Sequence, residues 1–139
     1  NININNKLPF STRVHGYINK ANPIEVALLI NLYKKAHFVF VPSFAECFGL
    51  VFNEANCFGV PSVTRDTGGV NTTVQNGYNG IVLPFHANTD DYTDAIFYLI
   101  NNPALYQQMS LNAYDLFQKK LNWEVAGENI NRIIHKLGS

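Results

Sequence analysis

Charged side chains are scarce in this sequence, and the two signs cancel. Asp, Glu, Lys and Arg make up 14% of the 139 residues, and ten acidic residues balance ten basic ones. A protein that holds nucleic acid by its phosphates needs a concentrated basic surface. The chain contains no basic stripe, so we do not expect nucleic acid to be a partner.

Cysteine is also rare. Cys47 and Cys57 are too few for a disulfide framework in a chain of this size, and they lack the Cys/His spacing of a zinc site. Both stand next to apolar residues. We therefore expect buried, reduced thiols and no structural metal.

Long apolar runs are missing as well. A bilayer span needs roughly 20 consecutive apolar residues, whereas the most apolar short run, residues 38–41, has only the length of a strand. The first residues do not resemble a secretory signal. These observations favour a cytoplasmic protein. If a longer chain associates with a membrane surface, we expect a helix in a partner domain to make that contact.

Apolar residues, by contrast, are plentiful. They make up 47% of the chain and include ten Phe and seven Tyr. A chain of this length can build one compact core but not two ordinary domains. We therefore expect a single domain over residues 1–139.

Strand-like and helix-like segments alternate along the first two thirds of the chain. The sequence predicts short strands at 13–17, 37–41, 62–64 and 80–84, of which 37–41 is the most apolar, and the segments between them predict helices at 23–35, 49–58 and 70–75. From Thr89 onward only helices are predicted, at 90–101, 103–120 and 123–137. This order indicates an α/β fold, a Rossmann-like parallel sheet flanked by helices, followed by an all-helical C-terminal tail.

Glycines mark two turns that would lie at the same edge of such a sheet. The carboxyl ends of parallel strands meet at one edge, where ligands of α/β proteins bind, and the predicted loops there are 42–49, 64–69 and 83–88. Gly49 precedes one predicted helix and Gly68-Gly69 precedes another. Free backbone N–H groups at helix starts bind anions, so the two turns together predict sites for the two phosphates of a nucleoside diphosphate. Alone, either turn is more typical of an ordinary strand-to-helix loop.

Two carboxylates flank the first of these turns. Glu46 lies in the predicted loop and Glu54 lies more than one turn inside the predicted helix. On one continuous helix, two residues that are eight positions apart point in directions that differ by about 80°. Helical geometry alone would therefore not bring Glu46 and Glu54 together. A polyhydroxyl ligand lying along the start of the helix could meet both, because carboxylate oxygens accept hydrogen bonds from sugar and ribose hydroxyls.

Five short blocks then resemble a known family. Their order and spacing are similar to those of the family-4 class (group 1) of retaining GT-B glycosyltransferases, and the resemblance covers roughly residues 15–136. The blocks are Pro42-Ser43, Glu46-x7-Glu54 with Phe48-Gly49-Leu50 inside it, Gly59-Val60-Pro61-Ser62-Val63, Gly68-Gly69-Val70, and Asn76-Gly77-x-Asn79-Gly80.

The resemblance implies the C-terminal, donor-binding domain of a GT-B fold. It implies that Glu46 is the candidate catalytic residue, which contacts the hydroxyls of the donor sugar and is not a nucleophile. It implies that Glu54 accepts hydrogen bonds from the ribose hydroxyls of the nucleotide. The remaining donor-binding candidates are Ser43, Phe48, Gly49, Leu50, Gly68 and Gly69, and the glycine pair lies near the acceptor-facing mouth of the cleft.

The resemblance further implies a UDP- or GDP-linked sugar donor, with no metal and no cofactor. Helix ends and basic side chains of the family neutralise the diphosphate leaving group, which electrostatic reasoning makes the main catalytic contribution. The sequence departs from the family in two respects. Thr72 stands where the family has an acid, and nothing before Arg13 corresponds to the Arg/Lys pair that holds the diphosphate.

The N-terminal acceptor domain of the family has no counterpart in the chain either. We therefore expect one incomplete domain with little or no transferase activity of its own, and an exposed apolar sheet edge that favours self-association. A non-catalytic module that binds a nucleotide sugar or a glycan remains the alternative. A dinucleotide-binding dehydrogenase half is not supported, because no Gly-x-Gly-x-x-Gly follows the first predicted strand.

Overall fold

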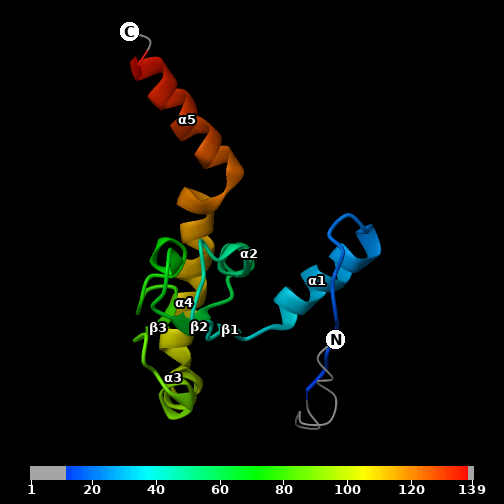
Figure 1. Ribbon diagram of the computed structural model, residues 1–139, viewed down its shortest axis with the longest axis vertical. Coiled ribbons are helices and arrows are strands. Elements are labelled where there is room, and N and C mark those ends of the chain that lie inside the picture. The colour runs from blue at the N-terminus through cyan, green and yellow to red at the C-terminus, as the bar shows by residue number, and fades with distance from the viewer. Residues whose placement is uncertain (1–11, 138–139) are drawn as a thin grey trace. The chain divides into compact units, whose positions relative to one another are not determined.

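The computed structural model describes residues 12–137. They belong to two compact units, of which the first ends at Leu32 and the second begins at Tyr33. The boundary falls inside the first helix, α1 (Pro23–Lys35). The single domain predicted over 1–139, part of which lies outside the described residues, stays a prediction. Figure 1 gives the order of the elements along the chain.

The first unit contains a loop and the start of α1. The Asn22 side chain accepts a hydrogen bond from the Ile24 N–H at 3.0 Å, Pro23 occupies the first helical position, and the Glu25 carboxylate accepts from the Asn19 N–H at 2.7 Å. This start confirms the predicted helix. The predicted strand at 13–17 is wrong, because these residues form a loop in which Gly16, with φ of 70°, interrupts the extended backbone.

The second unit is built on a parallel sheet of three strands. They are β1 (Val39–Val41), β2 (Ser62–Arg65) and β3 (Gly80–Leu83), in the spatial order β1-β2-β3. Every residue of the central strand β2 is buried, whereas Phe40 of β1 is 49% exposed. The strand predicted at 37–41 is therefore shorter than expected and lies at the edge of the described sheet.

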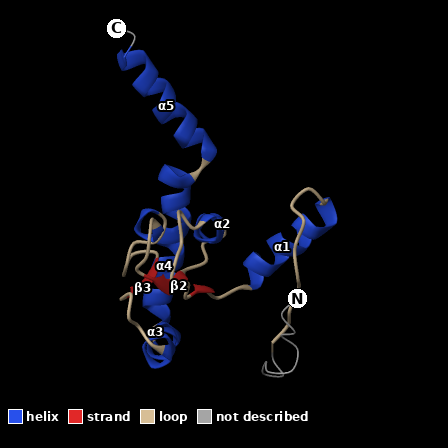
Figure 2. Cartoon of the chain, viewed as in Figure 1, coloured by secondary structure: helices blue, strands red, loops and turns tan. Residues whose placement is uncertain are grey.

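Helices connect and follow the strands. They are α2 (Leu50–Cys57), the 3-10 helix η1 (Val70–Thr72), α3 (Thr89–Asn101), α4 (Pro103–Leu116), the π-helical turn η2 (Phe117–Leu121) and α5 (Trp123–Leu137). Figure 2 shows helices around the strands of this unit and helices alone after β3. The predicted α/β class with a helical tail is confirmed.

Local signals fix the helices of the tail. Asn88 and Asp91 form a reciprocal capping box at the start of α3, and Pro103 stands at the first position of α4. The Asn122 side chain accepts a hydrogen bond from the Val125 N–H at 2.9 Å at the start of α5. Within residues 12–137, no helix is both long enough and apolar enough to cross a membrane.

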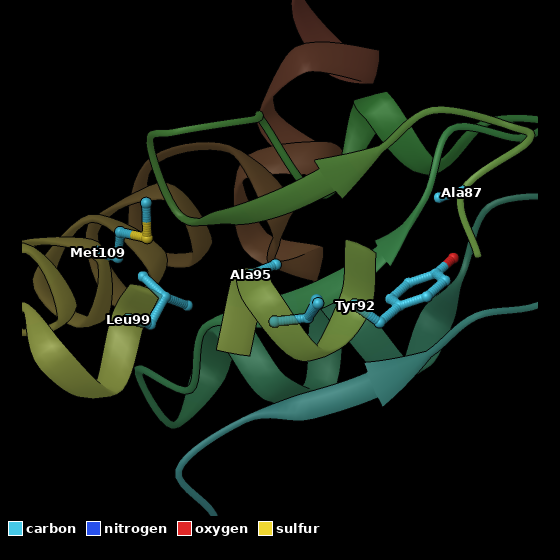
Figure 3. Close-up of a cluster of buried hydrophobic side chains, with 6 residues drawn as sticks. Ala87, Tyr92, Ala95, Leu99 and Met109 are labelled. Carbon is cyan, nitrogen blue, oxygen red and sulfur yellow. The ribbon is translucent and has the colours of Figure 1, made fainter. Parts of the chain in front are cut away.

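Apolar side chains cover both faces of the sheet. One cluster joins Val63 of β2 to α3 and α4, and Figure 3 shows its members Ala87, Tyr92, Ala95, Leu99 and Met109. The second cluster is Phe52, Val70 and Val74, with Val39, Val41 and Val82 packed against it. Consecutive residues of a strand point to opposite faces of the sheet. Ile81 therefore packs against the first cluster and Val82 against the second.

A buried polar network ties α2 to the turn before β3. The amide nitrogen of Asn79 donates to the side-chain oxygen of Asn56 and to the Thr73 carbonyl, both at 2.9 Å, and the Asn79 oxygen accepts from the Gln75 N–H at 2.7 Å. Asn56, Thr73 and Asn79 are fully buried. Each buried amide is thus paired, as the cost of burying an unpaired polar group requires.

We expect Asn79→Ala to lower the free energy of unfolding by about 2–4 kcal/mol, because it removes the partner of the buried Asn56 side-chain oxygen and of the Gln75 N–H, and one of the two donors to the Thr73 carbonyl. Urea denaturation of both proteins measures the difference. Asn131→Ala, at an exposed position of α5, is the matched control and should change stability by less than about 0.5 kcal/mol. Equal effects of the two substitutions would contradict a stabilising role of the network.

Candidate functional site

The loop after β1 packs directly against the loop after β2, at the carboxyl ends of both strands. The Gly69 N–H donates to the Cys47 carbonyl at 2.8 Å, and the Thr67 hydroxyl donates to the Phe44 carbonyl at 2.9 Å. The Thr73 hydroxyl lies 3.3 Å from the Phe48 carbonyl. The structure thus brings the loop of Glu46 and the Gly68-Gly69 turn together, as the sequence predicts.

The two glycines of that turn permit this contact. A Cβ on Gly68 would overlap the Glu46 carbonyl oxygen, and a Cβ on Gly69 would overlap the Cys47 carbonyl oxygen. Gly68 also has φ of 52°, a conformation that disfavours side chains. The absence of both side chains is therefore required by the loop-to-loop contact itself, whatever ligand the turn binds.

The helix predicted at 70–75 after this turn is wrong in length. Only Val70–Thr72 are helical, and they form a 3-10 helix. Three residues align too few peptide dipoles to create an anion site. The prediction of two phosphate-binding helix starts is therefore reduced to one helix of sufficient length, α2. The donor-binding roles of Gly68 and Gly69 stay predictions.

Gly49 begins the helix that remains. It has φ of 73° and ψ of 60°, and a Cβ there would overlap the ring of the buried Phe52. No side chain caps the helix at Gly49, and its first turn carries no acidic residue. The N-cap and first turn of α2 thus supply no side chain that neutralises the positive end of its dipole. This arrangement favours an anion beside Gly49 and Leu50.

Glu46 lies beside this helix start. Its side chain is half-buried, and its Cγ lies 3.5 Å from the position that a Cβ on Gly49 would take. Its carbonyl is the one against which Gly68 packs. The structure therefore brings Glu46, Gly49 and Gly68 together, with Gly68 against the backbone carbonyl of Glu46 and Gly49 near its side chain.

Glu54 has a partner that the sequence reasoning missed. The Tyr33 hydroxyl donates to Oε2 of Glu54 at 2.9 Å, and the Tyr33 ring stacks on Phe58 with centroids 5.4 Å apart. Burial, and then the charge and hydrogen bond of Glu54, raise the pKa of Tyr33 well above its ordinary value. In the helix predicted at 23–35, Tyr33 stands at one of the regularly spaced apolar positions. That pattern predicts burial of the ring and does not predict a hydrogen bond from its hydroxyl.

Arg65 was also missed, because the sequence placed it in a turn. It is the last residue of β2 and only 5% exposed. Its guanidinium donates to the carbonyls of Pro42 and Phe85 and lies 4.0 Å from the centre of the Phe44 ring. Arg65 thereby joins the loops after β1 and β3. The sequence offered one signal for such a role, because Arg65 is a cation that directly follows the predicted strand 62–64.

The remaining candidates line the same loop. Ser43 is half-buried, whereas Phe48 and Leu50 expose 40% and 63% of their surface. Cys47 is exposed, so the prediction of a buried thiol is wrong there; Cys57 is partly buried, and burial raises its pKa. Cys47 is exposed because its carbonyl, rather than its side chain, faces the Gly69 turn.

One cavity of the second unit lies away from the candidate residues. It has a volume of about 630 Å³, lies beside β3 and α3, and is lined by residues that include Ile81, Asp91 and Asp94 but none of the candidates. Among residues 12–137, no cluster of three or more His, Cys, Asp or Glu side chains could hold a metal ion. The predicted independence of metals and cofactors is not tested by this observation.

Comparison with known proteins identifies the family. The family described as "Glycosyl transferases group 1" matches residues 11–116. The chain belongs to this family. A D-inositol 3-phosphate glycosyltransferase of Kribbella flavida is 35% identical over 100 residues, which are 72% of this chain and 23% of that protein. The GT-B group 1 relationship predicted from the sequence is therefore confirmed.

Solved structures agree with this group 1 assignment. Sucrose-phosphate synthase from Thermosynechococcus elongatus superposes with a TM-score of 0.70 at 28% identity, over 79% of this chain and 27% of that one. Anabaena Alr3699/HepE in complex with UDP has a TM-score of 0.67 at 22% identity, over 76% of this chain and 29% of that one. The second likeness shows the fold alone. The chain spans about a quarter of the length of these proteins.

We expect Gly68→Ala to destabilise the second unit far more than Gly77→Ala. Both glycines have positive φ, so both substitutions carry the backbone penalty of about 1–2 kcal/mol. Only at Gly68 does the new Cβ overlap backbone, whereas a Cβ on Gly77 meets nothing within 4 Å. Urea denaturation of the two variants measures the difference. Equal losses would show that the loop-to-loop contact is not tight.

The raised pKa of Tyr33 predicts a loss of stability in alkali. The unfolded chain ionises Tyr33 near its ordinary pKa of 10.0, whereas the folded protein holds the proton to higher pH. The free energy of unfolding should therefore fall as pH rises above about 10. Tyr33→Phe should make this fall shallower, as urea denaturation between pH 8 and 11 would measure. An unchanged slope would contradict the assignment of the shift to Tyr33.

Proposed function

We propose that this group 1 chain is the donor-binding part of a glycosyltransferase that transfers a sugar from a nucleoside diphosphate to an acceptor with retention at the anomeric carbon. The observation that carries the proposal is the uncapped start of α2, with Glu46 beside it and Glu54 further along the same helix. Family membership supports sugar transfer. HepE is described in complex with UDP and with UDP-glucose, which supports a nucleotide-sugar ligand.

The proposed roles follow from the chemistry of each group. The N–H groups of Gly49 and Leu50, at the positive end of α2, would contact the diphosphate and stabilise the negative charge that develops on it as the sugar leaves. Glu46 would accept hydrogen bonds from the sugar hydroxyls, and Glu54 from the ribose hydroxyls. Ser43 and Phe48 would complete the surface. Neither glutamate needs to exchange a proton with the substrate in this scheme.

The rigid contact between the loops serves the same reaction. Catalysis by fixed dipoles requires that the donors be in place before charge develops. Gly68 packs against the backbone carbonyl of Glu46, and Gly49 lies near its side chain. The Gly68-Gly69 turn thereby contributes to the site through the position of Glu46, in addition to the donor contact predicted for the glycines themselves.

The proposed donor is UDP- or GDP-linked, and the enzyme requires an acceptor-binding partner domain. Neither a metal nor a cofactor enters the proposed scheme. We further propose a cytoplasmic location, self-association through the exposed edge of β1, and little activity of this chain alone. The alternative is a module that binds a nucleotide sugar or glycan without catalysis, and it would share the donor site.

Substitution of the two glutamates should separate the proposed contacts. Glu54→Gln should weaken binding of UDP or GDP and of the matching nucleotide sugar alike, by about tenfold, because one charged acceptor is lost from the ribose. Glu46→Gln should weaken only the nucleotide sugar. Isothermal titration at millimolar ligand measures both, and Glu124→Gln in α5 is the control. Absence of binding by the unsubstituted chain would contradict the donor-site proposal.

A further inference from the structure

We propose that Tyr33 is a positioning residue that orients the Glu54 carboxylate and thereby makes the nucleotide site selective for ribose over deoxyribose. The inference rests on the proposed function, in which Glu54 accepts hydrogen bonds from the ribose. It adds a residue from outside the sequence blocks on which the donor site was recognised, and it assigns that residue a measurable consequence for ligand choice.

The first support is geometric. Glu54 and Phe58 are four residues apart, so they lie on the same face of α2 and its C-terminal cap. The Tyr33 ring covers that face: it stacks on Phe58 with an interplanar angle of 4°, and its hydroxyl reaches Oε2 of Glu54 at 2.9 Å. Tyr33 is 8% exposed. A ring fixed by stacking therefore places one donor at one defined oxygen of the carboxylate.

The second support concerns the direction of the hydrogen bond. The Tyr33 phenol is protonated at neutral pH because the ordinary pKa of tyrosine is about 10, and burial and the neighbouring Glu54 raise that pKa further. A protonated phenol donates to the carboxylate. The contact therefore leaves Glu54 as an acceptor, and it constrains rotation about the side-chain bonds that aim the carboxylate.

The consequence is selectivity. A glutamate with several rotatable bonds loses conformational freedom when it binds a ligand, and that loss weakens binding unless the side chain is already ordered. Two vicinal ribose hydroxyls can donate to one carboxylate only if its plane is correctly turned. An oriented Glu54 should therefore bind a ribonucleotide more tightly than the matching 2′-deoxyribonucleotide. A Glu54 side chain that rotates freely should show a smaller difference between the two affinities.

The test compares ribonucleotide with deoxynucleotide binding. The unsubstituted chain and its variants are titrated with UDP and 2′-deoxy-UDP, and with GDP and 2′-deoxy-GDP. We expect the unsubstituted chain to prefer the ribonucleotide about tenfold and Tyr33→Phe, which keeps the ring and its stacking, to reduce that preference to about threefold or less. Tyr106→Phe is the matched control, because the Tyr106 hydroxyl donates to the His37 carbonyl at 3.1 Å, outside the candidate site.

A second readout needs no ligand. Three-bond scalar couplings of the Glu54 side chain, measured by NMR, should indicate one rotamer in the unsubstituted chain and in Tyr106→Phe, and rotamer averaging in Tyr33→Phe. Retention of both the ribose preference and the single rotamer by Tyr33→Phe would overturn the inference. If the unsubstituted chain binds no nucleotide or shows no ribose preference, the role of Glu54 in the proposed function fails instead, and the couplings still decide whether Tyr33 orients Glu54.

Discussion

The contact between the Gly68-Gly69 turn and the loop of Glu46 is the constraint on which the site depends. Two carbonyl groups, those of Glu46 and Cys47, lie where the side chains of any residue other than glycine would be. The loop is thereby held against the end of β2, and α2 starts at Leu50, four residues after Glu46. A carboxylate and a helix start that would otherwise move independently are thus placed at one edge of the sheet. The rest of the candidate site is arranged around this fixed point.

Oriented dipoles and a hydrogen-bond donor contribute to the electrostatics of the site. The start of α2 presents a partial positive charge without a capping side chain or an acid in its first turn. Arg65, the buried cation nearby, donates to backbone carbonyls of the loops after β1 and β3 and lies over the Phe44 ring, and so joins the two loops. Tyr33 orients Glu54 in the same way, through a neutral donor. Such an arrangement suits a ligand that carries both hydroxyls and phosphates, because the groups that receive it are already directed.

Much of this fold could be predicted from local signals in the sequence. Asn22-Pro23, Asn102-Pro103 and Asn122 set helix starts, and the alternation of short apolar runs with helices indicated the parallel sheet. The loops at its carboxyl edge were also placed correctly. The errors arose where tertiary contacts override local pattern. Residues 13–17 form a loop that contains Gly16 with positive φ instead of the predicted strand. The helix predicted at 70–75 is limited to a 3-10 helix over residues 70–72, and the hydroxyl of Thr73, which follows it, bonds to the carbonyls of Val70 and Phe48. Tyr33 and Arg65 were missed because their partners are distant in sequence.

The most direct test of the central claim is an NMR titration of the isotopically labelled 139-residue chain with UDP and with GDP up to millimolar concentration, following backbone amide shifts. If the start of α2 is the diphosphate site, the amides of Phe48, Gly49 and Leu50 should shift most, together with those of the adjoining Gly68 and Gly69. Shifts centred instead on the cavity beside Asp91 and Asp94, or no shift at any residue, would contradict the assignment of the nucleotide site to this edge of the sheet.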